Sequence, residues 1–330
     1  MSSISSIKSE RLGILGACAL TLSGCAGLEP APKVADTHEL VDVPELVNVP
    51  FFPQTEFDCG PAALATILND AGVRVTPAEL TDAVYVEGLN GSLQVELLAA
   101  TRRHGLLPVP IPGTPEDLLA EIASGRPVLV LQNLRFARLP AWHYAVVVGY
   151  TAGDDRFVLR SGEHRRREER ARRFLRSWQL ADNWGFVAVT PGEIPVSAKS
   201  GAYMRALVGA ARQLDSAAAS KAYRAAVDHW PNDPLVLFLS ASQEHAAANL
   251  EAAASLYRRA IEVKPEHAAA RNNLANILLD QGCREAALHE AQAALSLHAT
   301  DDSLRAAIAD TLNTIQAAPQ DSGTACDVTG

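Results

Sequence analysis

The sequence lacks the features that mark several large classes of protein. Its formal net charge of −9 leaves no excess of Lys and Arg to attract phosphate backbones, so we expect no nucleic-acid partner. Its longest apolar run, residues 12–22, falls short of the ~20 residues that span a bilayer. No CxxC pair and no Cys/His cluster with zinc spacing occurs, so we expect neither a metal nor another cofactor. The 330 residues, 48% of them hydrophobic, are instead enough for roughly two globular domains.

The apolar run follows two basic residues and ends at Leu22-Ser23-Gly24-Cys25. This ending resembles the lipobox of bacterial lipoproteins, in which the cysteine is acylated and becomes the first mature residue. The resemblance implies a signal peptide over residues 1–24 and a lipid on Cys25 that attaches the protein to a membrane. Ala26, where an Asp would retain such a protein at the inner membrane, implies the outer membrane, with the chain facing the periplasm. An ordinary secretory signal is the alternative.

Residues 25–44 contain three prolines and no apolar period, so we predict a tether there. Residues 45–195 place helical patterns before short apolar runs, which predicts an α+β domain. The expected helices cover residues 61–72, 77–86, 92–103 and 115–124, and the expected strands cover residues 127–132, 143–149, 157–160 and 185–190.

Residues 197–316 are rich in Ala and repeat with a fixed period. Pro231 and Pro265 lie 34 residues apart, and the same step relates Tyr223 to Tyr257 and a series of alanines. This is the period of tetratricopeptide repeats, so we predict an all-α repeat domain that binds a protein partner. A closing helix is expected over residues 303–315 and a flexible tail over residues 317–330.

Three residues of the first domain have the chemistry of a thiol enzyme. Cys59 begins a predicted helix, whose dipole favours the nucleophilic thiolate. His143 opens a predicted strand and could take the thiol proton, so we expect Cys59 to be a thiolate at neutral pH. The side-chain amide of Gln54 could join the Cys59 backbone N–H in holding an oxyanion.

Two motifs containing these residues carry a family resemblance: Gln54-x4-Cys59-Gly60-Pro61-Ala62-Ala63-Leu64 and Trp142-His143-Tyr144-Ala145-Val146-Val147-Val148-Gly149. They resemble the papain-like leader peptidases that trim double-glycine bacteriocin precursors. The whole layout is similar to bacterial lipoprotein cysteine peptidases with C-terminal tetratricopeptide repeats. The resemblance implies a papain-like fold, a Cys59 nucleophile, a His143 general base, a Gln54 oxyanion donor, and a protein or peptide substrate.

The third member of the expected catalytic group departs from the family pattern. Leader peptidases orient the imidazole with an Asp on the strand after the histidine strand, and Ser161 occupies that place here. A hydroxyl can orient the ring but cannot stabilise the imidazolium as a carboxylate would. Asn183, next to Trp184, is a second candidate, since papain uses an Asn close to a Trp.

Two other functions remain open at this stage. The missing Asp favours a non-catalytic lipoprotein scaffold with a degenerate peptidase domain, and the same Cys-His pair could serve an acyl or amide transferase. The Arg-dense stretch from Arg160 to Arg176 has two interpretations: a solvated hairpin end and helix face, or a clamp for an acidic substrate or a C-terminal carboxylate.

The lipobox generates the first testable prediction. Cys25→Ser should release the protein from the membrane fraction and leave its domains folded, because each buried methylene of the missing acyl chains contributed about 0.8 kcal/mol of anchoring. Cell fractionation with Cys18→Ser as the control measures this. Recovery of Cys25→Ser entirely with membranes would mean that another surface anchors the chain.

Overall fold

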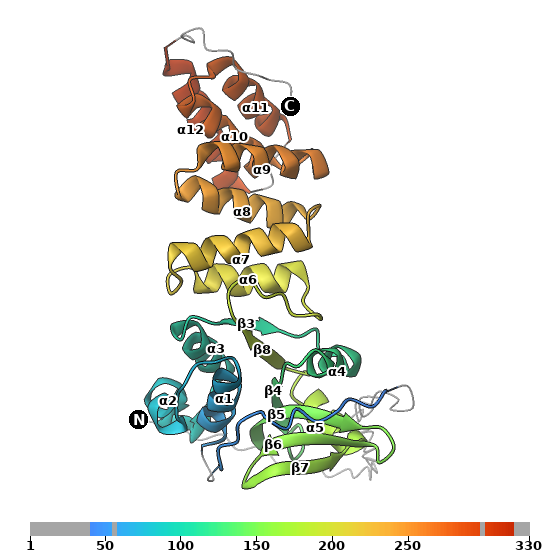
Figure 1. Ribbon diagram of the computed structural model, residues 1–330. Coiled ribbons are helices and arrows are strands. Elements are labelled where there is room, and N and C mark those ends of the chain that lie inside the picture. The colour runs from blue at the N-terminus through green and yellow to red at the C-terminus, as the bar shows by residue number, and fades with distance from the viewer. Residues whose placement is uncertain (1–39, 55–57, 298–300, 320–330) are drawn as a thin grey trace, which may run out of the picture. The chain divides into compact units, whose positions relative to one another are not determined.

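The computed structural model describes residues 40–54, 58–297 and 301–319. A mixed domain comes first and a series of helices, α6 to α12, follows it (Figure 1). This confirms the predicted order of an α+β domain and an all-α domain. The predicted signal peptide, Cys25 and most of the tether and the tail lie outside the described residues.

The mixed domain contains five helices and eight strands among its described residues. The helices are α1 (Cys59–Asp70), α2 (Pro77–Val84), α3 (Gln94–Arg103), α4 (Pro115–Ala123) and α5 (Ala171–Gln179). The strands are β1 (Tyr85–Val86), β2 (Gly91–Ser92), β3 (Leu107–Pro110), β4 (Val128–Asn133), β5 (Trp142–Thr151), β6 (Arg156–Ser161), β7 (His164–Arg170) and β8 (Gly185–Val189).

Six of these strands form one antiparallel sheet in the order β3-β8-β4-β5-β6-β7. Alternate residues of the central strand β5 face opposite cores. Tyr144 and Val146 join the core built by α1, α2 and α3, whereas Ala145 and Val147 join the core built by α4 and α5. The helices therefore cover both faces of the sheet, with α1 and α3 on one side and α4 on the other (Figure 1).

Three sequence-based expectations for this domain need correction. The strands β1, β2, β3 and β7 were not expected, and β7 takes up part of the Arg-dense stretch. The helix expected to begin at Ser92 begins at Gln94 instead, and Ser92 pairs with Tyr85 in the two-stranded sheet β1-β2. At the predicted tether, Leu40 and Val43 are buried, and Val43 exchanges both backbone hydrogen bonds with Tyr150, at 2.9 and 3.0 Å. The core of the mixed domain therefore includes Leu40 and Val43, which lie within the predicted tether.

The second domain consists of helices in the described part of the chain. They are α6 (Ser200–Ala210), α7 (Ser216–His229), α8 (Pro234–Ala246), α9 (Leu250–Val263), α10 (Ala268–Asp280), α11 (Arg284–Ser296) and α12 (Asp302–Ala317). The repeated positions Ala226, Ala260 and Ala294 are completely buried, as expected where paired helices approach closely. No helix among the described residues is long and apolar enough to cross a membrane.

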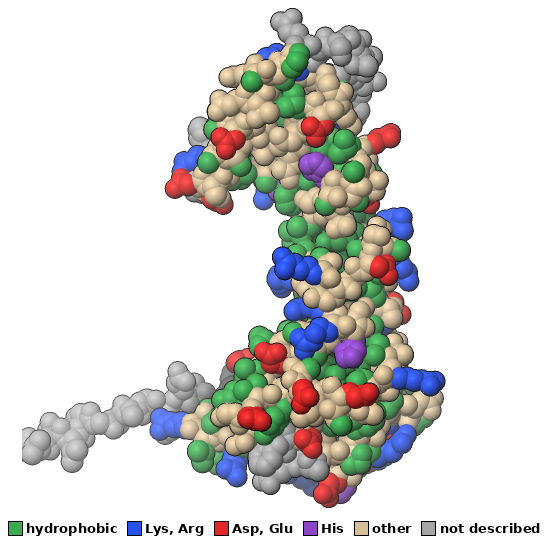
Figure 2. Space-filling model, turned by 90° about the vertical axis from the view of Figure 1, so that its left-hand side faces the viewer, with side chains coloured by type: hydrophobic (Ala, Val, Ile, Leu, Met, Phe, Trp, Pro, Cys, Tyr) green, Lys and Arg blue, Asp and Glu red, His purple; other side chains and the backbone are tan. Residues whose placement is uncertain are grey.

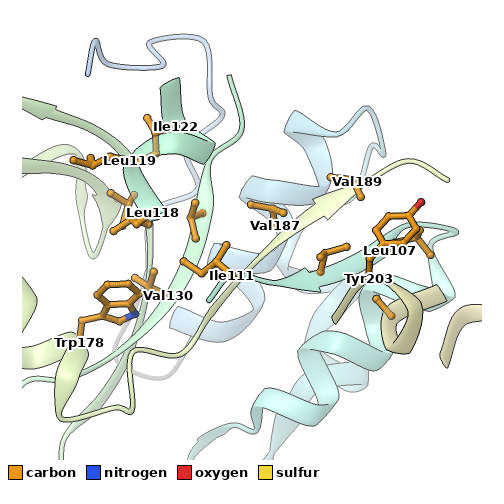
Figure 3. Packing of buried hydrophobic residues seen from close by; sticks show 14 of the residues in the cluster. Leu107, Ile111, Leu118, Leu119, Ile122, Val130, Trp178, Val187, Val189 and Tyr203 are labelled. Carbon is orange, nitrogen blue, oxygen red and sulfur yellow. The ribbon is translucent and has the colours of Figure 1, made fainter. Parts of the chain in front are cut away.

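The first repeat helices share a core with the sheet. Tyr203, Met204 and Leu207 of α6 are buried in the same cluster as Leu107 of the edge strand β3 and Val187 of its neighbour β8. Figure 3 shows the ring of Tyr203 beside Leu107. A cut after residue 195, the predicted domain boundary, would therefore expose part of the core of the mixed domain.

The surface carries charges of both signs. On the face shown in Figure 2, acidic and basic side chains are interspersed with apolar and neutral ones. This distribution agrees with the modest net charge of −9 and gives this face no broad basic field.

The shared core predicts that α6 stabilises the mixed domain. Leu207→Ala in the full chain should lower the free energy of unfolding by about 2–5 kcal/mol, because it removes a buried side chain and leaves a cavity. Its neighbour provides the control: Leu207 is 0% exposed and Val208 is 47% exposed, so Val208→Ala should change stability by less than about 0.5 kcal/mol. Urea unfolding followed by Trp fluorescence measures both. Equal effects of the two variants would refute the role assigned to α6.

Candidate active site

Cys59 is the first residue of α1, and the start of that helix lies against β5 and β2. A Cβ atom on Gly60 would overlap the side chain of Ser92 and contact the ring of Tyr144, so only glycine fits there. The hydroxyl of Tyr144 also donates to the Ser92 carbonyl at 3.1 Å. These contacts fix Cys59 beside Tyr144, the residue directly after His143, and the backbone N–H of Tyr144 donates to the Cys59 sulfur.

The ionisation of Cys59 contradicts the expected thiolate. Burial raises the pKa of the Cys59 thiol above its ordinary value, even though backbone N–H groups of Tyr144, Gly60 and Cys59 itself favour the anion. The carboxylate of Asp58 acts in the same direction as burial. The resting residue is therefore a neutral thiol at pH 7. It is the free cysteine of the described residues, since Cys283 is disulfide-bonded.

His143 opens β5, and its ring is held by Ser161 at the end of β6. The His143 Nε2 atom lies 2.8 Å from the Ser161 Oγ atom, and Ser161 is buried. Burial, together with the positive charge of Arg167, lowers the pKa of His143 to about 4. The imidazole is therefore neutral at pH 7, and a neutral imidazole can accept a proton.

Gln54 is tied to the turn that follows Ser161. Its side-chain Oε1 accepts from the Gly162 N–H at 2.8 Å, and its own backbone N–H donates to the Gly162 carbonyl at 3.0 Å. Because the amide oxygen is held there, the amide orientation is fixed and Nε2 is the atom that could donate to a substrate. Gln54 is 7% exposed, which limits competition from water.

The segment before Gln54 is held by a buried cation, Arg160, which is the first residue of the Arg-dense stretch. Arg160 on β6 is 1% exposed and donates to the Glu45 carboxylate at 2.8 Å. It also donates to backbone carbonyls of Leu46 and Val49, at 3.1 and 3.3 Å. Burial alone would raise the pKa of Glu45, but hydrogen bonds from Arg160 and Arg166 outweigh it and lower that pKa. Nothing in the local sequence distinguishes Arg160 from its solvated neighbours.

Asn183, the other candidate for the third residue, belongs to a different part of the domain. It has φ 51° in the turn between α5 and β8, and its backbone N–H donates to the Trp178 carbonyl at 3.0 Å. Its side chain packs close to Gly113, and no hydrogen bond joins it to His143 among the described residues. Within the same ranges, no three His, Cys, Asp or Glu side chains are placed to hold a metal ion.

The raised pKa of Cys59 predicts how its alkylation depends on pH. An ordinary cysteine has a pKa of about 8.5, so the rate of Cys59 alkylation by iodoacetamide should keep rising with pH above that value. The rate should show no plateau between pH 5 and 8, where a preformed thiolate would give one. Peptide mass spectrometry of the Cys59 peptide measures the rate, and the urea-unfolded chain is the matched control. A midpoint below that of the unfolded chain would show that the resting thiol is ionised after all.

Comparison with known proteins identifies the fold of the first domain. Residues 46–185 match the model of the Peptidase_C39 like family. Among curated proteins, none matches the chain significantly.

Solved structures show more distant likenesses. A C39-like protein from Bacillus anthracis is 18% identical, with 46% of this chain and 98% of that chain covered and a TM-score of 0.38. The peptidase domain of Streptococcus ComA, a bifunctional ABC transporter involved in a quorum-sensing pathway, is 20% identical, with coverage of 43% and 98% and a TM-score of 0.36. The TPR domain of Sgt2 from Aspergillus fumigatus is 19% identical, with coverage of 36% and 79% and a TM-score of 0.32.

The family match spans the candidate catalytic residues Gln54, Cys59, His143 and Ser161, and it ends where β8 begins. The chain therefore carries a papain-like domain that matches the Peptidase_C39 like family, a cysteine peptidase family, ahead of its helical repeats.

Proposed function

We propose that this chain is a thiol-dependent peptidase that cleaves a peptide or amide bond at Cys59. The observation that carries the proposal is the position of the Cys59 sulfur, at the start of α1 and in contact with the N–H of Tyr144, the residue that directly follows a neutral His143 in β5. The lipid on Cys25 would tether the enzyme to the periplasmic face of the outer membrane, and the repeats would bind a protein partner.

The proposed reaction begins with proton transfer. With Nε2–H donating to the Ser161 Oγ, the other ring nitrogen, Nδ1, is free to accept the Cys59 proton as substrate binds. The sulfur then attacks the carbonyl carbon, and the electron pair of the C=O bond moves to the oxygen. Gln54 Nε2 and the Cys59 N–H are the donors for that oxyanion.

The imidazolium next gives its proton to the leaving amine, and the C–N bond breaks to leave a thioester on Cys59. Water, deprotonated by His143, hydrolyses the thioester and restores the thiol. If an amine attacked the thioester in place of water, the same residues would catalyse transfer of the acyl group to that amine, which is the transferase alternative. The raised pKa of the resting thiol favours deprotonation that is coupled to substrate binding over a preformed ion pair.

The direct test is the appearance of new peptide termini. The purified chain is incubated with a proteome-derived peptide library, and mass spectrometry compares it with Cys59→Ala. We expect cleavage products that need the thiol and that share a sequence pattern around the cut. Identical products from the two proteins, or none from either, would favour the non-catalytic scaffold.

The hydrogen bond between His143 and Ser161 predicts a graded series of variants. Ser161→Ala removes one neutral hydrogen bond, net about 1 kcal/mol, and should slow kcat/KM about tenfold. His143→Ala should cause a far larger loss, since the base itself is removed. Ser161→Asp should be tolerated or activating, provided that the carboxylate reaches the ring.

Asn183→Ala is the matched control for this series, and it should leave kcat/KM within about twofold of wild type. A loss for Asn183→Ala as large as that for His143→Ala would transfer the orienting role from Ser161 to Asn183. The series is measured on one peptide from the library.

A further inference from the structure

The loop between β4 and β5, residues 134–141, exposes a concentration of large apolar side chains. Phe136 and Leu139 are 65% and 64% exposed, Trp142 directly after the loop is 55% exposed, and Leu134 is 40% exposed. Single exposed apolar side chains are common on protein surfaces, but a group of four within nine residues of one hairpin indicates a surface that contacts another molecule or a membrane.

The shape of this loop is fixed from inside by the buried side chain of Asn133. Its Oδ1 accepts from the backbone N–H groups of Arg135 and Ala141, at 3.1 and 3.0 Å, and its Nδ2 donates to the Phe136 carbonyl at 3.3 Å. Two backbone hydrogen bonds, of 2.9 and 3.1 Å, also close within the loop. Because these bonds satisfy backbone polar groups internally, moving the loop out of water costs less than it would for an open loop.

The charges of the loop are of one sign. Arg135 and Arg138 are both exposed, and the acidic residues that precede and follow them along the chain are as distant as Glu121 and Asp154. Arginines interspersed with Leu, Phe and Trp are typical of surfaces that lie in the interface of an anionic bilayer. There the apolar side chains enter the acyl region, the guanidinium groups stay with the phosphates, and Trp lies at the level of the headgroups.

The chain between the described domain and the lipobox is long enough for such a contact. Val43 pairs with Tyr150, near the end of β5 opposite to Trp142, and these two residues of β5 lie about 27 Å apart at the rise of a β-strand. The 15 residues that lead from Cys25 to Leu40 can span at most about 50 Å. The lipid proposed for Cys25 and the β4–β5 loop can therefore reach the same bilayer.

We propose that the β4–β5 loop docks the mixed domain onto an anionic bilayer, with Phe136, Leu139 and Trp142 as the inserted side chains. So small a contact binds weakly and reversibly, and it acts once the lipid on Cys25 keeps the chain at the membrane. Cys25→Ser is therefore still expected to leave the membrane fraction. Because Trp142 directly precedes His143, docking holds the candidate site close to the bilayer.

Fluorescence quenching of Trp142 tests this proposal in the full chain. The chain is incorporated into vesicles of phosphatidylethanolamine and phosphatidylglycerol, part of which carry bromine on their acyl chains, and bromine quenches a Trp only at close contact. Trp142 is the exposed tryptophan of the four. We expect quenching in the wild type and its loss in Trp142→Phe, and the difference between these two chains is the signal of Trp142.

Two double variants define the contact. Phe136→Ser with Leu139→Ser should lower the ratio of docked to undocked chain, measured by the Trp142 signal, about tenfold, because two inserted apolar side chains are lost. Arg135→Gln with Arg138→Gln should lower it by a similar factor, as should replacement of phosphatidylglycerol by phosphatidylcholine for the wild type.

Leu89→Ser with Val95→Ser is the matched control, because these side chains are 61% and 62% exposed elsewhere on the same domain. This pair should leave the Trp142 signal unchanged, and thermal unfolding confirms that every variant is folded. An absence of quenching in the wild type, or an equal signal from folded Phe136→Ser with Leu139→Ser, would overturn the proposal. An equal decrease in the control pair would do so as well, since it would indicate general apolar adhesion.

An apolar segment of the substrate is the alternative occupant of this surface. In that case Phe136→Ser with Leu139→Ser would slow cleavage of library peptides in the absence of vesicles and would leave the Trp142 signal unchanged, which refutes membrane docking. The quenching needs no bond cleavage, so a failure of the proposed peptidase activity would be seen separately, in the library experiment.

Discussion

The whole site depends on how closely the start of α1 approaches the sheet. Because Gly60 has no side chain, the first turn of α1 can lie in direct contact with Ser92 and Tyr144. Leu64, Ile67 and Leu68 then pack on the same face of the sheet as Tyr144. Burial of those side chains, each worth about 1.5–3 kcal/mol, holds the helix in place, so the position of Cys59 follows from the packing of α1.

A second constraint brings the remaining residues to the same end of the sheet. Arg160 is a buried cation whose hydrogen bonds cross from β6 to the segment before α1. The next residues of β6 and the turn after it, Ser161 and Gly162, contact His143 and Gln54 respectively. One strand end thus orients both the imidazole and the side-chain amide. Because Arg160 is buried, its charge must be compensated by several hydrogen-bond acceptors, and loss of one of them would leave part of that charge uncompensated.

The strands that sequence analysis found are those with neighbours on both sides. Apolar runs predicted β4, β5, β6 and β8, each of which lies between two other strands. The two strands of this six-stranded sheet that were missed, β3 and β7, are its edges. β3 contains Pro108 and Pro110, which an edge strand tolerates because it has unpaired N–H positions, and β7 is mostly charged because one of its sides faces solvent. Edge strands lack the continuous apolar run on which the prediction relied.

The sequence by itself determined the two-domain order and the 34-residue repeat, and it selected Cys59, His143, Gln54 and Ser161 as candidate site residues, because each of these depends on residue type and spacing along the chain. Only the tertiary structure decided the protonation states and the charge partners. Cys59 is a neutral thiol because segments distant in sequence bury it. This burial raises the pKa of the thiol by more than the backbone N–H groups near the start of α1 lower it. The same holds for Arg160: it stands in a basic stretch whose other arginines are mostly exposed, but it is itself buried among hydrogen-bond acceptors. Burial is a collective property of many segments, and the electrostatics of the site follow from it.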